Sequence, residues 1–479
     1  VAAVAGMAGP VEKQFFPSSD RPEVLVSVYH PQGTAIGATN ATTRRLEALI
    51  GEAEGVESLS AYVGAGAPRF FISANPEQPN PAFAKLIAVT EGVEARERLI
   101  ERLNERIAAG AFPEARVRVE KLLYGPPVDW PVSIRVLGDE PNRLREIGHE
   151  VREVIAEHPA TRDPHLEWDE RVPRLHLAID HQRLQLIGLS PDEVARQLQF
   201  QLDGMTITEL RDGIRLVPAV GRGAAQDVAD LRSLEVVNRE GRRVPLTQLG
   251  ELETVFEEPV IKRYNRQPFL AVNADVQGAQ PKDVTLEVWE ALGEVRGRLP
   301  AGYQLQIGGS VEQSSKAQAS IQALQPLMVV LMLIFIMLQM RSFAGTFMVV
   351  ATAPLGLIGA VAALLLFNQP FGFVATLGLI GLAGILMRNT LILTQQVADN
   401  AKAEMAMRDA VVEAAVQRAR PVVLTALAAM LAFVPLTLDS FWGPLAYVLI
   451  GGVAVGTLIT LLFVPALYAL WYRIASRAE

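Results

Sequence analysis

The segment 381-GLAGILMRNTLIL-393 carries one charge, on Arg388, among apolar and weakly polar side chains. Apart from this arginine, the chain is uncharged from residue 342 to residue 398. Runs of this length are typical of helices that cross a membrane. The guanidinium keeps its proton at physiological pH, and burying it near the bilayer centre costs about 2.5–3.5 kcal/mol. The segment therefore predicts a membrane helix whose arginine needs an anionic partner.

The composition favours a membrane protein and excludes several other classes. Half of the 479 residues are hydrophobic, and the mean hydropathy is positive, which is unusual for a soluble protein. The net charge of −8 argues against a nucleic-acid partner, because phosphate binding needs a basic surface. Cysteine is absent, so neither a disulfide nor a thiolate metal site can form.

Charge placement divides the chain into two regions. Charges occur throughout residues 11–316, and long uncharged runs follow. A spanning helix needs about 20 apolar residues, so these runs predict a transmembrane domain over 313–479. We expect five helices at about 320–340, 343–366, 372–397, 421–438 and 446–472, and an amphipathic cytoplasmic helix at about 399–420. The opening VAAVAGMAGP resembles the end of an apolar helix, so residues 1–12 are expected to be the tail of an upstream transmembrane helix in a fragment.

The loops between these helices predict their orientation. One set of loops receives seven basic residues near the membrane, and the other receives none, only Asp439. The seven are Arg341, Lys402, Arg408, Arg418, Arg420, Arg473 and Arg477. Because basic residues concentrate on the cytoplasmic side, we expect a cytoplasmic C-terminus. Residues 11–316 would then lie outside, in the periplasm of a Gram-negative cell.

Strand and helix patterns fill the outer region in two rounds of β-α-β-β-α-β. In the first round, VESLSAYV (56–63) and PRFFIS (68–73) read as strands around a glycine-rich turn. We therefore expect an α+β fold of two ferredoxin-like subdomains that precedes the α-helical bundle. The first subdomain covers 13–127, and the second covers 128–200 with 263–312. Short strands in the excess over 201–262 predict a β-rich subdomain inserted into the second.

Several motifs together make the whole chain resemble the C-terminal half of a resistance–nodulation–division (RND) exporter. FFPSSDRPEVLV (15–26) resembles the exit from the seventh transmembrane helix, and GPPVDWPVSIRVLGD (125–139) resembles the junction between two pore subdomains. The flanks of the docking insert are matched by IDHQRLQLIGLSPDEVARQL (179–198) and KRYNRQP (262–268). The tenth and eleventh helices are matched by GILMRNTLIL (384–393) and RARPVVLTALAAMLAFVPL (418–436). The two ferredoxin-like subdomains would then be pore subdomains, and the insert would be a docking subdomain.

This resemblance implies a homotrimeric antiporter of the bacterial inner membrane. It would use the proton gradient, without a cofactor, to export amphiphilic drugs or biocides. The implied partners are the N-terminal half of the same transporter, a periplasmic adaptor protein, an outer-membrane channel and membrane lipids. The sequence has no Walker loop, nucleophile elbow or GxGxxG motif that would indicate an ATPase or another enzyme.

The resemblance assigns four residues to proton transfer. Arg388 matches a basic residue of the tenth helix, more commonly lysine, that faces two aspartates on the fourth helix in the N-terminal half. Since arginine keeps its proton, we expect Arg388 to be a fixed counter-charge that tunes those carboxylates. Asn389 would join the site, Thr425 would be a relay hydroxyl, and Arg418 would stand at the cytoplasmic entrance. In the simpler alternatives Arg388 snorkels, Asn389 and Thr425 bond backbone carbonyls, and Arg418 anchors the membrane boundary.

The stretch YVGAGAPRFFIS (62–73) matches the wall and the glycine-rich loop of the substrate cleft in the family. Tyr62, Phe70 and Phe71 are the candidate surfaces for stacking of amphiphiles. On a regular strand only one of Phe70 and Phe71 could face the cleft. Each of the three aromatic side chains could instead belong to the core.

Other functions remain as alternatives. Heavy-metal export would need soft ligands along the path, but only Met7 and Met205 precede the first complete span. The six histidines show no metal-binding spacing, so the pattern argues against metal export and against a metal site. A non-transporting receptor, scaffold or lipid-binding module would use the same helices only as an anchor.

Overall fold

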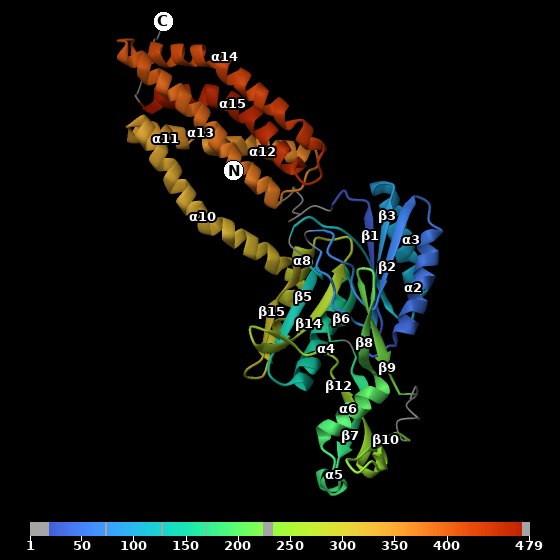
Figure 1. Cartoon of the computed structure of the whole chain (residues 1–479). Coiled ribbons are helices and arrows are strands. Elements are labelled where there is room, and N and C mark those ends of the chain that lie inside the picture. Colours follow the sequence, from blue (N-terminus) through green and yellow to red (C-terminus); the bar gives the residue numbers. More distant parts are fainter. Residues whose placement is uncertain (1–18, 72–73, 126–127, 169, 224–232, 472–479) are drawn as a thin grey trace. The chain divides into compact units, whose positions relative to one another are not determined.

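The structure is a computed structural model that describes residues 19–71, 74–125, 128–168, 170–223 and 233–471 (Figure 1). The expected helix tail at 1–12 therefore lies outside the described residues. The chain forms two compact units. One extends to Glu167 and resumes at Ile261, and the other runs from Trp168 to Val260.

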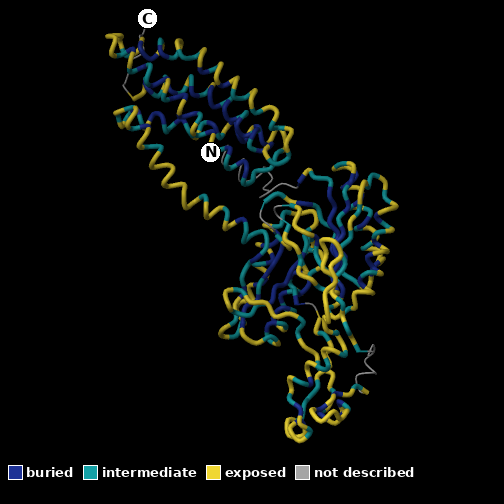
Figure 2. The backbone as a smooth tube through the Cα atoms, viewed as in Figure 1, coloured by how far each residue is buried: buried dark blue, intermediate teal, exposed yellow. Residues whose placement is uncertain are grey.

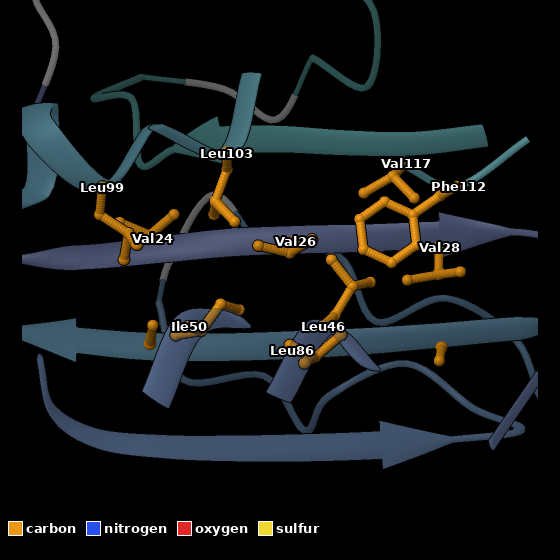
Figure 3. Close-up of a cluster of buried hydrophobic side chains, with 12 residues drawn as sticks. Val24, Val26, Val28, Leu46, Ile50, Leu86, Leu99, Leu103, Phe112 and Val117 are labelled. Atoms are coloured by element: carbon orange, nitrogen blue, oxygen red, sulfur yellow. The ribbon is translucent and has the colours of Figure 1, made fainter. Parts of the chain in front are cut away.

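The first α/β run builds a four-stranded sheet with one apolar face. Its elements are β1 (Glu23–Tyr29), α2 (Ile36–Gly51), β2 (Val56–Val63), β3 (Phe83–Thr90), α3 (Val93–Ala108) and β4 (Arg116–Lys121). The strands are antiparallel in the order β2-β3-β1-β4. Because alternate residues point to opposite faces, Val24, Val26 and Val28 share one face and pack with Leu46 of α2 and Leu103 of α3 (Figure 3). Burial of each such side chain stabilises the fold by about 1.5–3 kcal/mol.

The predicted strand at 68–73 is wrong. Residues 68–71 lie in the connection between β2 and β3, and 72–73 are outside the described residues. The strand that follows β2 is β3, which pairs with neighbours on both of its edges. Such a strand needs backbone N–H groups on both sides, and prolines at 68, 76, 79 and 81 lack them. The rule of alternation therefore does not apply to Phe70 and Phe71.

The second α/β run forms a mixed layer of strands and helices in the same unit. Its elements are β5 (Val132–Leu137), α4 (Pro141–Glu157), β6 (Thr161–Leu166), β13 (Lys262–Tyr264), β14 (Gln267–Val276), α8 (Pro281–Ala291), α9 (Gly293–Gly297) and β15 (Gln304–Ile307). The sheet order is β13-β14-β5-β15, and β6 also pairs with β14. Pro141 begins α4, where its missing N–H would have no helical partner anyway.

The unit from Trp168 to Val260 is rich in short strands. Its elements are β7 (Val172–Ile179), α5 (His181–Ile187), α6 (Pro191–Leu202), β8 (Met205–Asp212), β9 (Arg215–Gly221), β10 (Glu235–Val237), β11 (Arg243–Pro245), η1 (Leu246–Gln248) and β12 (Gly250–Glu257). This unit begins before the expected insert at 201–262, because β7 pairs with β12 over its whole length. The pairing draws β7, α5 and α6 into the same unit as the later short strands.

Among the described residues, five helical segments are long and apolar enough to cross a membrane, which agrees with the five helices predicted over 313–479. They are α10 (Gly309–Met340), α11 (Phe343–Val350) with η2 (Ala353–Leu355) and α12 (Gly356–Leu366), α13 (Phe373–Lys402), α14 (Met407–Phe433) with η3 (Pro435–Leu438), and α15 (Gly443–Trp471). Figure 2 shows α10 exposed along most of its length, and only 6% of its most apolar stretch of residues is buried. Its apolar surface is thus available to lipid or to other membrane helices.

The expected separate helix at 399–420 is divided between two long helices. α13 continues to Lys402, the chain turns, and α14 runs unbroken from Met407 past Pro421 to Phe433. Glu404 in the turn has a φ of 64°, a left-handed conformation that cannot continue a right-handed helix. Membrane helices tolerate an internal proline such as Pro421 when neighbouring groups satisfy the freed carbonyl.

Glycines bring α12 and α15 into close contact. A Cβ atom built on Gly359 would lie 2.1 Å from the carbonyl oxygen of Gly451. A Cβ atom on Gly451 would lie 2.5 Å from the carbonyl oxygen of Gly359. Membrane helices associate largely through packing, so small residues that let backbones approach stabilise the pair.

Gly359→Ala is expected to destabilise the helical bundle. The new methyl group meets backbone that cannot move aside, so we expect a loss of about 1–3 kcal/mol from overpacking. Thermal unfolding of the purified chain in detergent measures this loss. Gly384→Ala is the matched control, because a Cβ there meets nothing within 4 Å in the described part of this chain. An unchanged unfolding midpoint for Gly359→Ala would contradict the close contact.

Candidate functional site

Arg388 lies on a side of α13 that the rest of the described chain leaves exposed. Gly381 and Gly384 precede it on that side, and Ile392 follows one turn later; all three are exposed. None of the ion pairs among the described residues includes Arg388. Its guanidinium is therefore an unmatched cation on an open helix face, as far as the described residues reach.

The neighbouring polar residues of α13 point into the chain's own interior. Asn389 is one position along, about 100° around the helix, and is 4% exposed. Thr390 and Thr394 are fully buried. The Thr390 hydroxyl lies 2.9 Å from that of Thr352, next to η2, and the Thr394 hydroxyl donates to the Thr390 carbonyl. The structure thus separates Asn389 from the open face that carries Arg388.

Arg418 joins α14 to α13 through a line of hydrogen bonds near one end of both helices. Its Nε donates to Gln396 Oε1 at 2.9 Å, and Gln396 Nε2 donates to Asn400 Oδ1 at 2.9 Å. The amide of Asn400 in turn donates to the Ala410 carbonyl at 3.2 Å. Asn400 is buried. These bonds hold the Arg418 side chain against α13, beside an apolar cluster in which Val397 packs with Val411.

Thr425 lies on an exposed part of α14. Its hydroxyl donates to the Val422 carbonyl of its own helix at 2.9 Å. No hydrogen bond within the described chain joins Thr425 to Arg388, Asn389 or Arg418. The bond to its own helix is the simpler of the two alternatives considered for this threonine.

Tyr62 belongs to the face of the first sheet that lies opposite the apolar cluster. Strand register places four residues side by side across this face: Tyr62 on β2, Lys85 on β3, Ser27 on β1 and Arg118 on β4. Directly paired residues point to the same side of a sheet. We call these four residues, with Glu120 on the same side of β4 and Glu77 from the β2–β3 connection, the polar face.

Phe70 and Phe71 lie in the connection between β2 and β3. Phe70 is 38% exposed. The ring of Phe71 is partly covered and lies 5.3 Å from the guanidinium carbon of Arg21, within the range of a cation–π contact. Neither ring joins the apolar cluster under α2 and α3, so both lie outside the core of the first sheet.

Charges of alternating sign run across the polar face. The Lys85 ammonium lies 3.0 Å from Glu77 Oε1 and 3.8 Å from Glu120 Oε2, and it donates to Ser27 Oγ at 2.8 Å. Arg118 lies 2.8 Å from the other oxygen of Glu120. Lys85 and Arg118 have side chains only 10% exposed. Buried cations of this kind are stable only when opposite charges match them closely.

Arg118 also connects the first α/β run to the second. Its Nε and one terminal nitrogen bond both carboxylate oxygens of Asp275 on β14 at 2.8 Å. The guanidinium also lies 3.8 Å from the centre of the Trp130 ring. The other neighbour of Trp130 is His165, edge-on at 4.4 Å. A bidentate ion pair of this kind fixes the orientation of the two side chains as well as the distance between them.

Electrostatics at this junction keep His165 neutral. Burial lowers the pKa of His165 to about 3, and the positive charges of Arg116 and Arg118 act in the same direction. Its Nδ1 lies 2.7 Å from the Asp163 carbonyl. Burial likewise raises the pKa of Tyr29, which lies on β1 two residues from Ser27. Both groups are therefore uncharged at neutral pH and serve as packing and hydrogen-bonding groups.

Comparison with known proteins gives a match over nearly the full length. The AcrB/AcrD/AcrF family matches residues 1–472. The chain belongs to this family. Membership confirms the predicted relationship to RND transporters. Within this AcrB/AcrD/AcrF protein, no group of three or more His, Cys, Asp or Glu in the described residues could hold a metal ion.

Relatives of this family member include metal-resistance and multidrug-resistance proteins. "Nickel and cobalt resistance protein CnrA" of Cupriavidus metallidurans is 27% identical over 98% of this chain and 45% of its own length. "Multidrug resistance protein MdtC" of Yersinia pseudotuberculosis is 22% identical over 98% of this chain and 46% of its own length. A crystal structure of a heavy metal efflux pump shares the fold, with a TM-score of 0.77 at 21% identity over 98% of this chain and 50% of that one. The chain thus spans about half the length of the relatives it matches.

Sequence reasoning missed the charged residues of the polar face. Lys85 interrupts the otherwise uncharged strand FAKLIAVT, and Arg118 and Glu120 alternate with valines in ARVRVEKLL. Period-two alternation would have assigned these charges to one side of their strands. It would not have paired Arg118 with Asp275, which is 157 positions away.

His165 makes the stability of this family member depend on pH. Its pKa in the folded state is about 3, below the usual value near 6.5. Between pH 3 and pH 6.5 His165 is protonated in the unfolded chain and neutral in the folded chain. The free energy of unfolding therefore falls as the pH drops from 6.5 toward 3. The slope from this one group is at most about 1.4 kcal/mol per pH unit.

His165→Phe should remove this contribution while keeping a ring against Trp130. Unfolding midpoints measured between pH 7 and pH 4 should fall less steeply for His165→Phe than for the wild type. His181→Phe is the control, because His181 is exposed. Equal slopes for wild type and His165→Phe would contradict a neutral His165.

Proposed function

We propose that this chain is the C-terminal half of a proton-driven RND exporter. The observation that carries the proposal is the placement of Arg388 on an open face of a membrane helix, without an acidic partner among the described residues. An unmatched guanidinium within a bilayer is costly. Membership of the AcrB/AcrD/AcrF family supports a partner from the other half of the transporter. That half would supply the carboxylates that bind and release the proton.

In this proposal Arg388 acts as a fixed counter-charge. A guanidinium beside carboxylates lowers their pKa, so each carboxylate would gain its proton only where the local proton concentration is high. Protonation would weaken the attraction between the carboxylate and Arg388 and allow the two helices to separate. Because arginine does not release its own proton, the proton itself would travel on the carboxylates.

Three further residues support this proton path to different degrees. Arg418, held by Gln396, would stand at the cytoplasmic end of the helices, where its positive charge would favour the release of a proton from nearby groups. The Thr425 hydroxyl would have to leave the Val422 carbonyl before it could relay a proton. Asn389, buried in the chain's own interior, would stabilise α13 beside Arg388 without touching the proton.

The proposed topology places the α/β region in the periplasm and the C-terminus in the cytoplasm. The seven basic residues on one side of the helices support this orientation. The family supports a homotrimer in the inner membrane that works with an adaptor protein and an outer-membrane channel. Lipids would contact the exposed surface of α10.

Amphiphilic molecules are the proposed substrates. Tyr62, Phe70 and Phe71 offer aromatic surface outside the apolar core, and aromatic rings with few polar groups are typical of sites for such molecules. Divalent metal ions are the second candidate, because several relatives are named for nickel, cobalt, zinc or cadmium resistance. The aromatic surface of Tyr62, Phe70 and Phe71 supports the first candidate.

A susceptibility assay separates the two substrate classes. Cells that lack their own exporters would express this chain together with its N-terminal half and partners. They would then be challenged in parallel with cationic detergents or dyes and with cobalt, nickel or zinc salts. Protection against amphiphiles alone supports the first candidate, and protection against metal salts alone supports the second.

Arg388→Ala in the assembled transporter is expected to reduce efflux to the level of cells without it. The reason is that the carboxylates lose the charge that tunes their pKa. Efflux of a fluorescent amphiphile under an imposed proton gradient measures the effect. Arg420→Ala, on an exposed position of α14, is the matched control and should retain efflux.

The same experiment tests the alternative of a non-transporting receptor or scaffold. If wild-type cells show no gradient-dependent efflux of any tested compound, the transporter proposal fails. If wild-type efflux occurs and Arg388→Ala leaves it unchanged, transport stands but the assigned role of Arg388 is wrong.

A further inference from the structure

Lys85 occupies an unusual position for a lysine. It lies in the middle of β3, between β2 and β1, and the whole residue is 8% exposed. The residues before and after it on the strand, Ala84 and Leu86, point into the apolar cluster on the other face of the sheet. Lysine is rarely buried unless it is paired. The groups around the Lys85 ammonium must therefore compensate for its burial.

Oxygen atoms surround the Lys85 ammonium from three chain segments. Ser27 Oγ on β1 lies at 2.8 Å, Glu77 Oε1 in the β2–β3 connection at 3.0 Å, and Glu120 Oε2 on β4 at 3.8 Å. Ser27 Oγ and Glu120 Oε2 are themselves 3.4 Å apart. Carboxylate and hydroxyl oxygens bind divalent cations, including first-row metal ions such as cobalt. The ammonium thus stands where a small cation would be held.

The charge balance of the polar face depends on this one ammonium. Glu120 is shared with Arg118, but Arg118 is also bound by Asp275. Without Lys85, the carboxylates of Glu120 and Asp275 would keep their pairs with Arg118, and Glu77 would lose the ion-pair partner that it has among the described residues. The side chains of Glu77 and Glu120 remain 31% and 24% exposed, so dissolved ions can reach them. A cation from solution would then be the simplest replacement for the missing charge.

We propose that Lys85 is a specificity-determining residue that closes the polar face to divalent metal ions. Its tethered ammonium fills the position among the oxygens and neutralises Glu77 and Glu120. The face is thereby left to molecules that contact Tyr62, which lies directly beside Lys85 across the β2–β3 pair. This inference rests on the proposed function, because it assumes that the polar face lies on the substrate path.

Metal binding by the purified full chain tests the inference without any transport. Wild type and Lys85→Ala, in detergent and free of affinity tags, would be titrated with cobalt chloride. Isothermal titration calorimetry and the thermal unfolding midpoint would both be recorded. We expect Lys85→Ala to bind one cobalt ion at least tenfold more tightly than wild type, with a saturable rise in its unfolding midpoint, because a ligand that binds only the folded state stabilises it.

Further variants test whether tighter cobalt binding by Lys85→Ala depends on the oxygen atoms around residue 85. Lys85→Ala with Glu77→Gln should lose the tighter binding, because one of the two carboxylates is neutralised. Lys85→Arg should show no gain, because it keeps a tethered cation. Lys121→Ala should also show none, since Lys121 pairs with Glu97 and is half-buried away from these oxygens. Where Lys85→Ala is too unstable to purify, Lys85→Met removes the charge and keeps the volume of the stem.

Two results would overturn the inference. One is cobalt binding by wild type that is as tight as binding by Lys85→Ala or Lys85→Met. The other is a gain that persists after Glu77→Gln, which would place the ion elsewhere. Neither result bears on gradient-dependent efflux or on Arg388, so failure here is distinguishable from failure of the proposed function.

Discussion

A charge that leaves water has to be matched by an opposite charge, and this requirement shapes both regions of the chain. In the α/β region the chain matches its own buried cations. Arg118 is bound by Asp275 and Glu120, and Lys85 lies among Glu77, Glu120 and Ser27. In the helical region the described residues leave Arg388 unmatched. An unmatched guanidinium is costly once its helix lies within a bilayer, and the proposed carboxylates of the other half of the transporter would offset this cost.

The two faces of the first sheet have different roles. Alternate residues of the strands form the apolar cluster that packs against α2 and α3. The residues between them point to the opposite face, where Tyr62, Lys85, Ser27 and Arg118 lie in one row. A strand can serve both purposes because successive side chains point to opposite faces. The charged side chains of the polar face are thereby kept apart from the apolar core that keeps the sheet folded.

Features that depend on the length of an uncharged run were predictable from the sequence. Features that depend on contacts between residues far apart in the sequence were not. The five apolar helices follow from uncharged runs, because the thickness of a bilayer fixes the length of a spanning segment. The strand at 68–73 was misassigned because two adjacent phenylalanines outweighed the prolines around them. The domain boundary at Trp168 depends on the pairing of β7 with β12, and local patterns do not encode such a pairing. The sequence singles out Arg388 as a candidate for a proton site, and this stays a prediction. The burial of Asn389 depends on how α13 rotates against its neighbours, which the sequence does not encode locally.

The rotation of α13 explains how one helix can hold an unmatched charge and remain anchored. Its inner side is fastened to η2 through Thr390 and Thr352, and to α14 through Gln396 and Arg418. Its outer side carries Arg388 next to Gly384, where no side chain keeps a neighbouring helix at a distance. If the other half of the transporter supplies a carboxylate opposite Arg388, as proposed above, its protonation would act on a helix that hydrogen bonds join to two neighbouring segments. The cation and these bonds lie on different sides of the same helix, so a change at Arg388 would reach the neighbouring helices without breaking the bonds that join them.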